Sequence, residues 1–220
     1  MSSIEASSTE ALEDLLRRNA AVLLDVADDS IRRGLETGKA LAPDAGDYAP
    51  ELQRHAASFV TLCIKGELRG CTGSAYAHQP LVSDVAENAF AAAFTDSRFQ
   101  PLAANEAAEM RTEISLLTAP EPMKFSSEAD LLAQLVAGRD GLILKAGGRR
   151  GLFLPQVWQT LPEAGAFLHQ LKVKAGLDPD AWPPDVEVER FEAVKAARDD
   201  AGAAWINRPS RNPWSGSPNP

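Results

Sequence analysis

Residues 66–74 read Gly-Glu-Leu-Arg-Gly-Cys-Thr-Gly-Ser, and they follow an apolar run from Ser58 to Ile64. In an extended strand, side chains two positions apart share a face, so Arg69 and Cys71 are expected to lie side by side. A nearby cation favours the thiolate form of cysteine. The glycines would let a ligand or another backbone come close to the sulfur. This stretch is therefore the first candidate site.

The same stretch is predicted to be the second arm of a β-hairpin. Residues 58–65 are rich in β-branched and aromatic side chains, and Gly66 stands where a tight turn requires positive φ. Whether Cys63 and Cys71 share a face depends on whether the turn has two or three residues, because a one-residue slip moves every side chain to the other face. A purely structural interpretation also stands, in which the glycines make a tight hairpin and Cys71 is a small buried apolar residue.

Length and composition predict a globular protein. The chain has 220 residues, of which 45% are hydrophobic and 24% charged, enough for one core or for two lobes that share one. The net charge of −9 argues against nucleic-acid binding. We find no apolar run long enough to cross a membrane and no signal peptide, so a cytosolic protein with reduced thiols is expected.

Hydrophobic periodicity predicts alternating helices and strands. The helices are expected over residues 9–38, 80–94, 105–110, 127–138 and 163–175, and the strands over 111–118, 140–146, 151–154 and 186–194. The first helix is either one long helix or two that break near Asp28. Residues 1–8 are predicted to be an N-terminal tail, residues 9–197 the folded domain, and residues 198–220, rich in Pro, Ser and Asn, a C-terminal tail.

A base for the thiol is harder to assign. Among the three histidines, His78 is the best placed by sequence because it follows the cysteine strand. Glu113 and Ser115 share one face of the strand predicted over 111–118, and they would join the site if that strand neighbours the hairpin. Asp96 and Arg98 lie in a polar loop, where they either cap a turn or shape the site. No metal or nucleotide motif is present, so no metal and no cofactor is expected.

Four motifs stand in order along the chain: Leu68-Arg69-Gly70-Cys71-Thr72-Gly73, Asp96-Ser97-Arg98-Phe99-Gln100-Pro101-Leu102, Glu113-Ile114-Ser115-Leu116-Leu117 and Gly151-Leu152-Phe153-Leu154-Pro155-Gln156-Val157-Trp158. In register, they closely resemble the AMMECR family, which is named after a human chromosomal region. The match runs from about residue 10 to about residue 195. Thr72 departs from the pattern, since the family more often has isoleucine there, and the stretch after Arg198 has no counterpart.

The resemblance implies an α+β fold of two lobes, with antiparallel β-sheets packed with helices and a cleft near the Arg-Gly-Cys motif. Prokaryotic relatives are associated with a Memo-like protein and a radical S-adenosylmethionine (SAM) protein, which are therefore possible partners. The family's activity is not established. By position, the resemblance implies a site of Cys71, Arg69 and Glu113 as catalytic residues, with Gly70, Gly73, Asp96, Arg98 and Ser115 as substrate-binding residues.

Two functional hypotheses follow. In the first, the chain is a cytosolic enzyme or enzyme component that acts on a small molecule or a protein side chain. Arg69 would then hold the thiolate or an anionic substrate group, and Glu113 would move a proton. In the second, the Arg69-Gly70-Cys71 surface recognises a protein partner without turnover.

Overall fold

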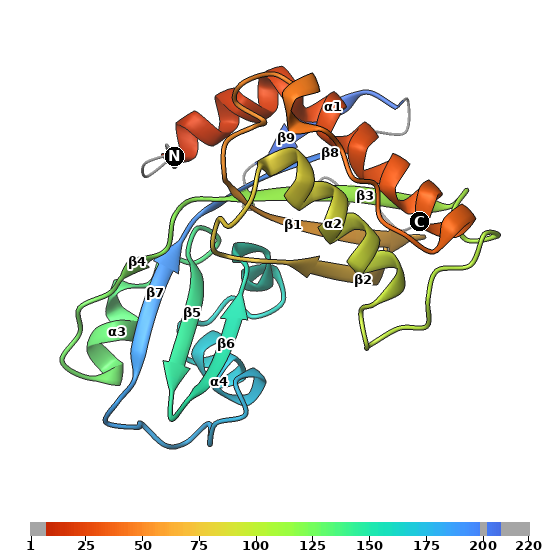
Figure 1. The fold of residues 1–220 in the computed structure, drawn as a ribbon. Coiled ribbons are helices and arrows are strands. Elements are labelled where there is room, and N and C mark those ends of the chain that lie inside the picture. The colour runs from red at the N-terminus through yellow and green to blue at the C-terminus, as the bar shows by residue number, and fades with distance from the viewer. Residues whose placement is uncertain (1–7, 199–201, 208–220) are drawn as a thin grey trace, which may run out of the picture. The chain divides into compact units, whose positions relative to one another are not determined.

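The chain forms two units, each built from one β-sheet and helices. The structure is a computed structural model that describes residues 8–198 and 202–207. Unit 1 takes the chain up to Ala119 and returns for Val194–Asn207, and unit 2 is Pro120–Ala193. Figure 1 shows both sheets and the helices that accompany them. The predicted α+β fold with two lobes is confirmed.

Unit 1 contains a five-stranded sheet in the order β2-β1-β3-β8-β9. Helices α1 and α2 lie on the same face of this sheet (Figure 1). Strand β2 lies at one edge, and β9 lies at the other. The elements of this unit are α1 (Thr9–Thr37), the 3₁₀ turn η1 (Ala45–Asp47), β1 (Ala57–Ile64), β2 (Glu67–Gly73), α2 (Leu81–Phe94), β3 (Met110–Leu117), β8 (Ala193–Arg198) and β9 (Ala204–Asn207).

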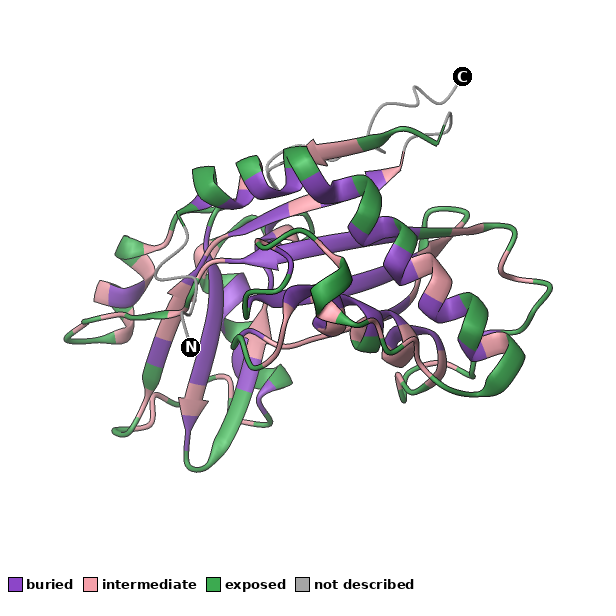
Figure 2. Ribbon diagram, turned by 45° about the horizontal axis from the view of Figure 1, so that its top comes forward, coloured by how far each residue is buried: buried purple, intermediate pink, exposed green. Residues whose placement is uncertain are grey.

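Helix α1 is one continuous helix, with no break at Asp28. The side chain of Ser8 accepts a hydrogen bond from the backbone N–H of Ala11 and caps the start. Gly38 ends the helix in the left-handed conformation, with φ of 69°. One face of the helix is buried and the opposite face is exposed (Figure 2). The sequence prediction for residues 9–38 is therefore confirmed.

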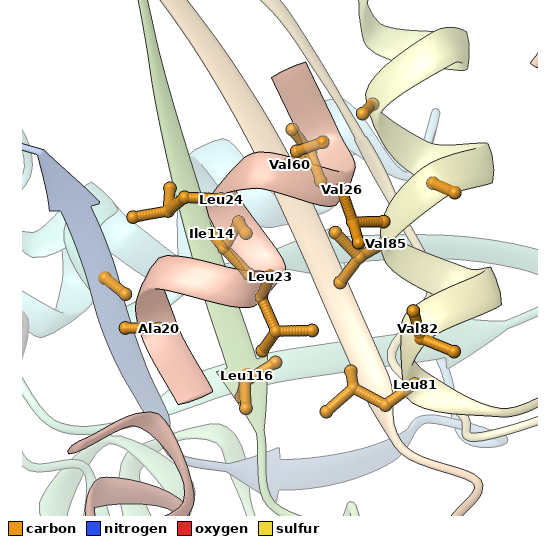
Figure 3. Packing of buried hydrophobic residues seen from close by; sticks show 14 of the residues in the cluster. Ala20, Leu23, Leu24, Val26, Val60, Leu81, Val82, Val85, Ile114 and Leu116 are labelled. Atoms are coloured by element: carbon orange, nitrogen blue, oxygen red, sulfur yellow. The ribbon is translucent and has the colours of Figure 1, made fainter. Parts of the chain in front are cut away.

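The buried face of α1 packs against the sheet and α2. Figure 3 shows these side chains meeting in one layer. Each fully buried Leu, Val or Ile contributes about 1.5–3 kcal/mol relative to an exposed one, so this layer is the main attraction between helices and sheet. Its central members are Leu23, Leu24 and Val26 of α1, Val60 of β1, Ile114 and Leu116 of β3, and Leu81, Val82 and Val85 of α2.

The predicted hairpin forms with a two-residue turn. Lys65 and Gly66 both have positive φ, 53° and 84°, which matches the twist of the flanking strands. Beyond the turn the register contains a bulge: Cys63 lies opposite Leu68, but Leu62 lies opposite Gly70. Arg69 is therefore the extra residue on β2. This one-residue shift decides which face of the sheet receives each side chain that follows.

Unit 2 contains a four-stranded sheet in the order β4-β7-β5-β6. Trp158 and Phe167 stack at its core, with ring centroids 4.0 Å apart. The buried ammonium of Lys172 is neutralised by Glu128 and donates hydrogen bonds to two backbone carbonyls. The elements are β4 (Glu121–Pro122), α3 (Glu128–Gln134), β5 (Gly141–Ala146), β6 (Arg149–Phe153), the 3₁₀ turn η2 (Pro155–Gln159), α4 (Ala164–Lys174) and β7 (Glu187–Phe191).

Several sequence predictions differ from the structure. The helix predicted over 127–138 is α3, which ends at Gln134. In the helix predicted over 105–110, residues 105–109 form turns and Met110 begins β3, since so short a segment gains little from helical hydrogen bonds. The strand predicted over 186–194 is two strands, because β7 belongs to the sheet of unit 2 and β8 to the sheet of unit 1. Within the predicted tail 198–220, residues 204–207 form β9, which gains backbone hydrogen bonds from β8. Residues 208–220 lie outside the described part of the chain.

Candidate functional site

A row of four polar side chains crosses the sheet of unit 1. It lies on the face opposite to α1 and α2, which we call the thiol face because Cys63 and Cys71 both lie on it. Thr61 of β1 lies directly opposite Cys71 of β2 and directly opposite Glu113 of β3. The Thr61 hydroxyl donates a hydrogen bond to the sulfur of Cys71 over 3.3 Å. Lys195 of β8 forms an ion pair with Glu113 and completes the polar row.

The bulge places Cys71 on this face. Without an extra residue, the hairpin register would set Cys71 opposite Val60, whose side chain lies in the core under the helices. The bulge at Arg69 instead sets Cys71 opposite Thr61. Cys63 and Cys71 therefore share a face, which answers the question that the sequence left open. Glu113 joins them because β3 pairs with β1, as the site hypothesis requires.

Asp96 and Arg98 bind the backbone of Cys71. β2 is an edge strand, so alternate residues along it have backbone N–H and C=O groups with no partner strand, and Cys71 is one of the residues whose backbone groups bind side chains instead. Asp96 accepts a hydrogen bond from the N–H over 2.9 Å, and the Arg98 guanidinium donates one to the C=O over 3.3 Å. The two side chains also bind each other at 2.7 and 3.0 Å. They thus take the place of a neighbouring strand and fix the position of the cysteine.

The Arg98 guanidinium is a cation close to Cys71. The Asp96 side chain is only 7% exposed, and its hydrogen bonds from Arg98 hold the pKa of this carboxyl well below its usual range. The pKa of Arg98 is raised, chiefly by the hydrogen bonds with Asp96 and to a smaller extent by the attraction of Cys71. The sequence prediction gave this electrostatic role to Arg69.

Arg69 has a different partner. Its guanidinium makes a two-point ion pair with Glu106, at 2.8 and 3.0 Å, and lies 5.8 Å from the ring centre of Phe99. The pair lowers the pKa of Glu106 to about 2. The expectation that Arg69 lies beside the thiol rests on strict alternation along β2, and the bulge breaks that alternation. Arg69 instead ties the loop before β3 to the edge strand.

The two predicted substrate-binding glycines allow close approach of backbone. A Cβ at Gly70 would lie 2.0 Å from the carbonyl oxygen of Ala92 in α2. A Cβ at Gly73 would lie 2.3 Å from the carbonyl oxygen of Ser58. The sequence allowed either a ligand or another backbone segment beside these glycines. The structure shows a backbone neighbour at both positions. Ser115 is buried on β3, two positions from Glu113 on the same face.

The two cysteines differ in environment. Both are free thiols and partly exposed. Burial, and then the negative charge of Glu113, raise the pKa of Cys63 to about 11. Cys63 is therefore a protonated thiol at neutral pH. Cys71 alone of the two accepts the Thr61 hydrogen bond and has its backbone held by Asp96 and Arg98.

His78 is placed with other partners. Its Nδ1 lies 3.6 Å from the carboxylate of Asp84 on α2. Asp84 also accepts hydrogen bonds from the backbone N–H and the hydroxyl of Ser58, on the helix-covered side of β1. The contacts of His78 thus lead to α2, whereas the sulfur of Cys71 contacts Thr61 on the thiol face.

Sequence reasoning missed two members of the polar row. Thr61 carries a readable signal, because it alternates with the apolar Val60 and Leu62 within the predicted strand. Lys195 carries none, since it is far from Glu113 in the sequence and reaches it only through the pairing of β8 with β3. Among the residues that the structure describes, no group of three or more His, Cys, Asp or Glu side chains could hold a metal ion. In the same part of the chain, no helix has the length and apolar character needed to cross a bilayer.

Comparison with known proteins identifies the family. The sequence model of the AMMECR1 family matches residues 24–196. A protein of Methanothermobacter thermautotrophicus is 39% identical over 184 residues, covering 81% of this chain and 94% of the relative. One of Methanosarcina acetivorans is 36% identical, covering 81% and 90%. The crystal structure of an uncharacterized protein from Pyrococcus horikoshii is similar, with a TM-score of 0.79, 33% identity, and coverage of 86% of this chain and 96% of that chain. The chain therefore belongs to the AMMECR1 family.

Proposed function

We propose that the chain is an enzyme, or a component of one, that uses Cys71 as a nucleophile. Its substrate would be an electrophilic group on a small molecule or on a protein side chain. The observation that carries this proposal is the pair of hydrogen bonds made to Cys71. Thr61 donates one to its sulfur, and the cationic guanidinium of Arg98 donates one to its backbone carbonyl. Both favour the thiolate, which is the nucleophilic form. Glu113, one strand further along the polar row, is the group proposed to move a proton.

The cytosol is the compartment that this proposal requires, because a nucleophilic thiol must stay reduced. Both described cysteines are free. In this proposal Arg69 supports the site indirectly, since its ion pair with Glu106 holds the loop that lies before β3.

The test measures how fast Cys71 is alkylated by iodoacetamide as a function of pH. A Cys63→Ser variant leaves Cys71 as the single cysteine, and the Cys63→Ser/Cys71→Ser variant gives the background. We expect alkylation to reach half its maximum clearly below about pH 8.5, the value for an ordinary cysteine. A midpoint at or above that pH, with slow labelling throughout, would remove the thiolate mechanism.

A non-catalytic recognition module is the second candidate. One observation weighs against catalysis by the whole motif: Arg69, Gly70, Gly73 and Asp96 all make contacts within the fold that need no substrate. The partners suggested by the resemblance are a Memo-like protein and a radical SAM protein. Size-exclusion chromatography of the chain mixed with each of them would test this candidate. Formation of a stable complex, together with an ordinary alkylation midpoint for Cys71, would favour recognition over catalysis.

A further inference from the structure

We infer that Thr61 and Lys195 are positioning residues for Cys71, Thr61 by hydrogen bonding to the sulfur and Lys195 by neutralising Glu113. This inference rests on the proposed function and extends it to two residues outside the motifs. Both belong to the polar row, in which each side chain comes from a different strand of one sheet. The row therefore has a fixed order, with Cys71 at one end and the cation at the other.

The side chain of Thr61 has a fixed position beside the sulfur of Cys71. Thr61 is only 6% exposed, and the strand register fixes its neighbours on both adjacent strands. A β-branched side chain in a strand has little freedom about χ1, so its hydroxyl keeps one direction. That direction brings Oγ1 to 3.3 Å from the sulfur of Cys71, with the hydroxyl as donor. A donor in this position stabilises a sulfur that carries negative charge.

Lys195 controls the charge on the same face. The Glu113 side chain is only 9% exposed, and an unpaired carboxylate there would repel a thiolate across Thr61. At Cys63, burial and then the charge of Glu113 raise the pKa, whereas the charge of Lys195 lowers it. The other charged groups near the thiols are Asp96 and Arg98, which form an ion pair with each other, Glu67, which also raises the pKa of Cys63, and Arg111, which lies opposite Cys63 on β3. Within this set, Lys195 is the cation that offsets the charge of Glu113.

The test for Thr61 compares two substitutions in the Cys63→Ser background. Thr61→Val keeps the shape and removes the hydroxyl, whereas Thr61→Ser keeps the hydroxyl. We expect Thr61→Val to slow the alkylation of Cys71 at pH 7 by about tenfold and to move its midpoint up by about one pH unit. Thr61→Ser should remain close to the parent. Equal rates for the two variants would overturn the role of Thr61.

The test for Lys195 compares the directions in which two single substitutions move the alkylation midpoint of Cys71. Lys195→Met leaves the Glu113 carboxylate unpaired, so alkylation of Cys71 should slow and its midpoint should rise. Glu113→Gln leaves the ammonium unpaired, so the midpoint should fall. The double variant should return toward the parent, and because it contains no unpaired charge it also serves if Lys195→Met does not fold. A general loosening of the structure would move both single variants in the same direction, and that result would overturn the inference.

The proposed function and the role of Thr61 and Lys195 can be refuted separately. An ordinary midpoint for Cys71 in the Cys63→Ser parent would remove the proposed function. A low midpoint in that parent that stays unchanged in the Thr61 and Lys195 variants would leave the proposed function standing and remove this inference alone.

Discussion

A substitution at Gly70 tests the position of β2 most directly, because the nearest atom to a Cβ at this position belongs to the backbone of Ala92. The substitution Gly70→Ala would set a methyl group 2.0 Å from the carbonyl oxygen of Ala92, where contact normally requires at least 3.0 Å. Strand and helix would have to separate by on the order of 1 Å, in a part of the core that is otherwise closely packed. Overpacking of this kind costs about 3 kcal/mol, at the upper end of its usual range. For a chain of this length, that corresponds to a fall of about 6–12 °C in the melting temperature.

Thermal unfolding followed by circular dichroism measures this change. Gly165→Ala is the matched control, because Gly165 lies in α4 and a Cβ there would have no heavy atom within 4 Å. The control should be neutral or slightly stabilising, since alanine is the better helix former. If Gly70→Ala melted within about 2 °C of the parent, the close approach of β2 and α2 would be refuted. Gly70 would then be better explained as a contact to substrate.

Two further predictions concern ionisation. The ion pair with Arg69 lowers the pKa of Glu106 from 4.5 to about 2, so the stabilisation it gives is complete above pH 4.5 and is lost as the pH falls through about 2. The difference in unfolding free energy between the parent and Glu106→Gln, measured with urea, should therefore be constant near neutral pH and shrink in acid; a constant difference down to pH 2 would contradict this. Because the pKa of Cys63 is about 11, its alkylation in a Cys71→Ser variant should stay slow at pH 8 and rise only toward pH 11; mass spectrometry showing rapid labelling at pH 8 would contradict it.

The motif residues divide into two groups according to what they contact. Arg69, Gly70 and Gly73 hold the edge strand against its loop, its helix and its neighbouring strand. Asp96 and Arg98 act on the backbone of Cys71. Much of the Arg-Gly-Cys motif therefore places the thiol, whereas Thr61, which hydrogen-bonds its sulfur, lies on the neighbouring strand. Catalytic hypotheses for this chain are best tested at Thr61 and Lys195 as well as at Cys71.

Local sequence signals were sufficient for most of the secondary structure. Ser8 and Gly38 delimit α1 because a side-chain acceptor and a left-handed residue satisfy the free backbone groups at the helix ends. Gly66 sets the hairpin turn because the turn needs positive φ. These features depend on a few neighbouring residues. The motifs, in turn, were specific enough to identify the family.

Tertiary structure decided the site. A two-residue turn alone would have placed Cys71 in the core, and the bulge at Arg69 moved it to the thiol face. In the bulged register Gly70 lies against the backbone of α2, where there is no room for a Cβ, and α2 lies outside the hairpin. Lys195 reaches Glu113 only because β8 returns to the first sheet after the chain has built unit 2. The sequence by itself therefore determined which segments become helices and strands, whereas the partners of each reactive side chain depend on strand pairing between distant residues, which no local pattern encodes.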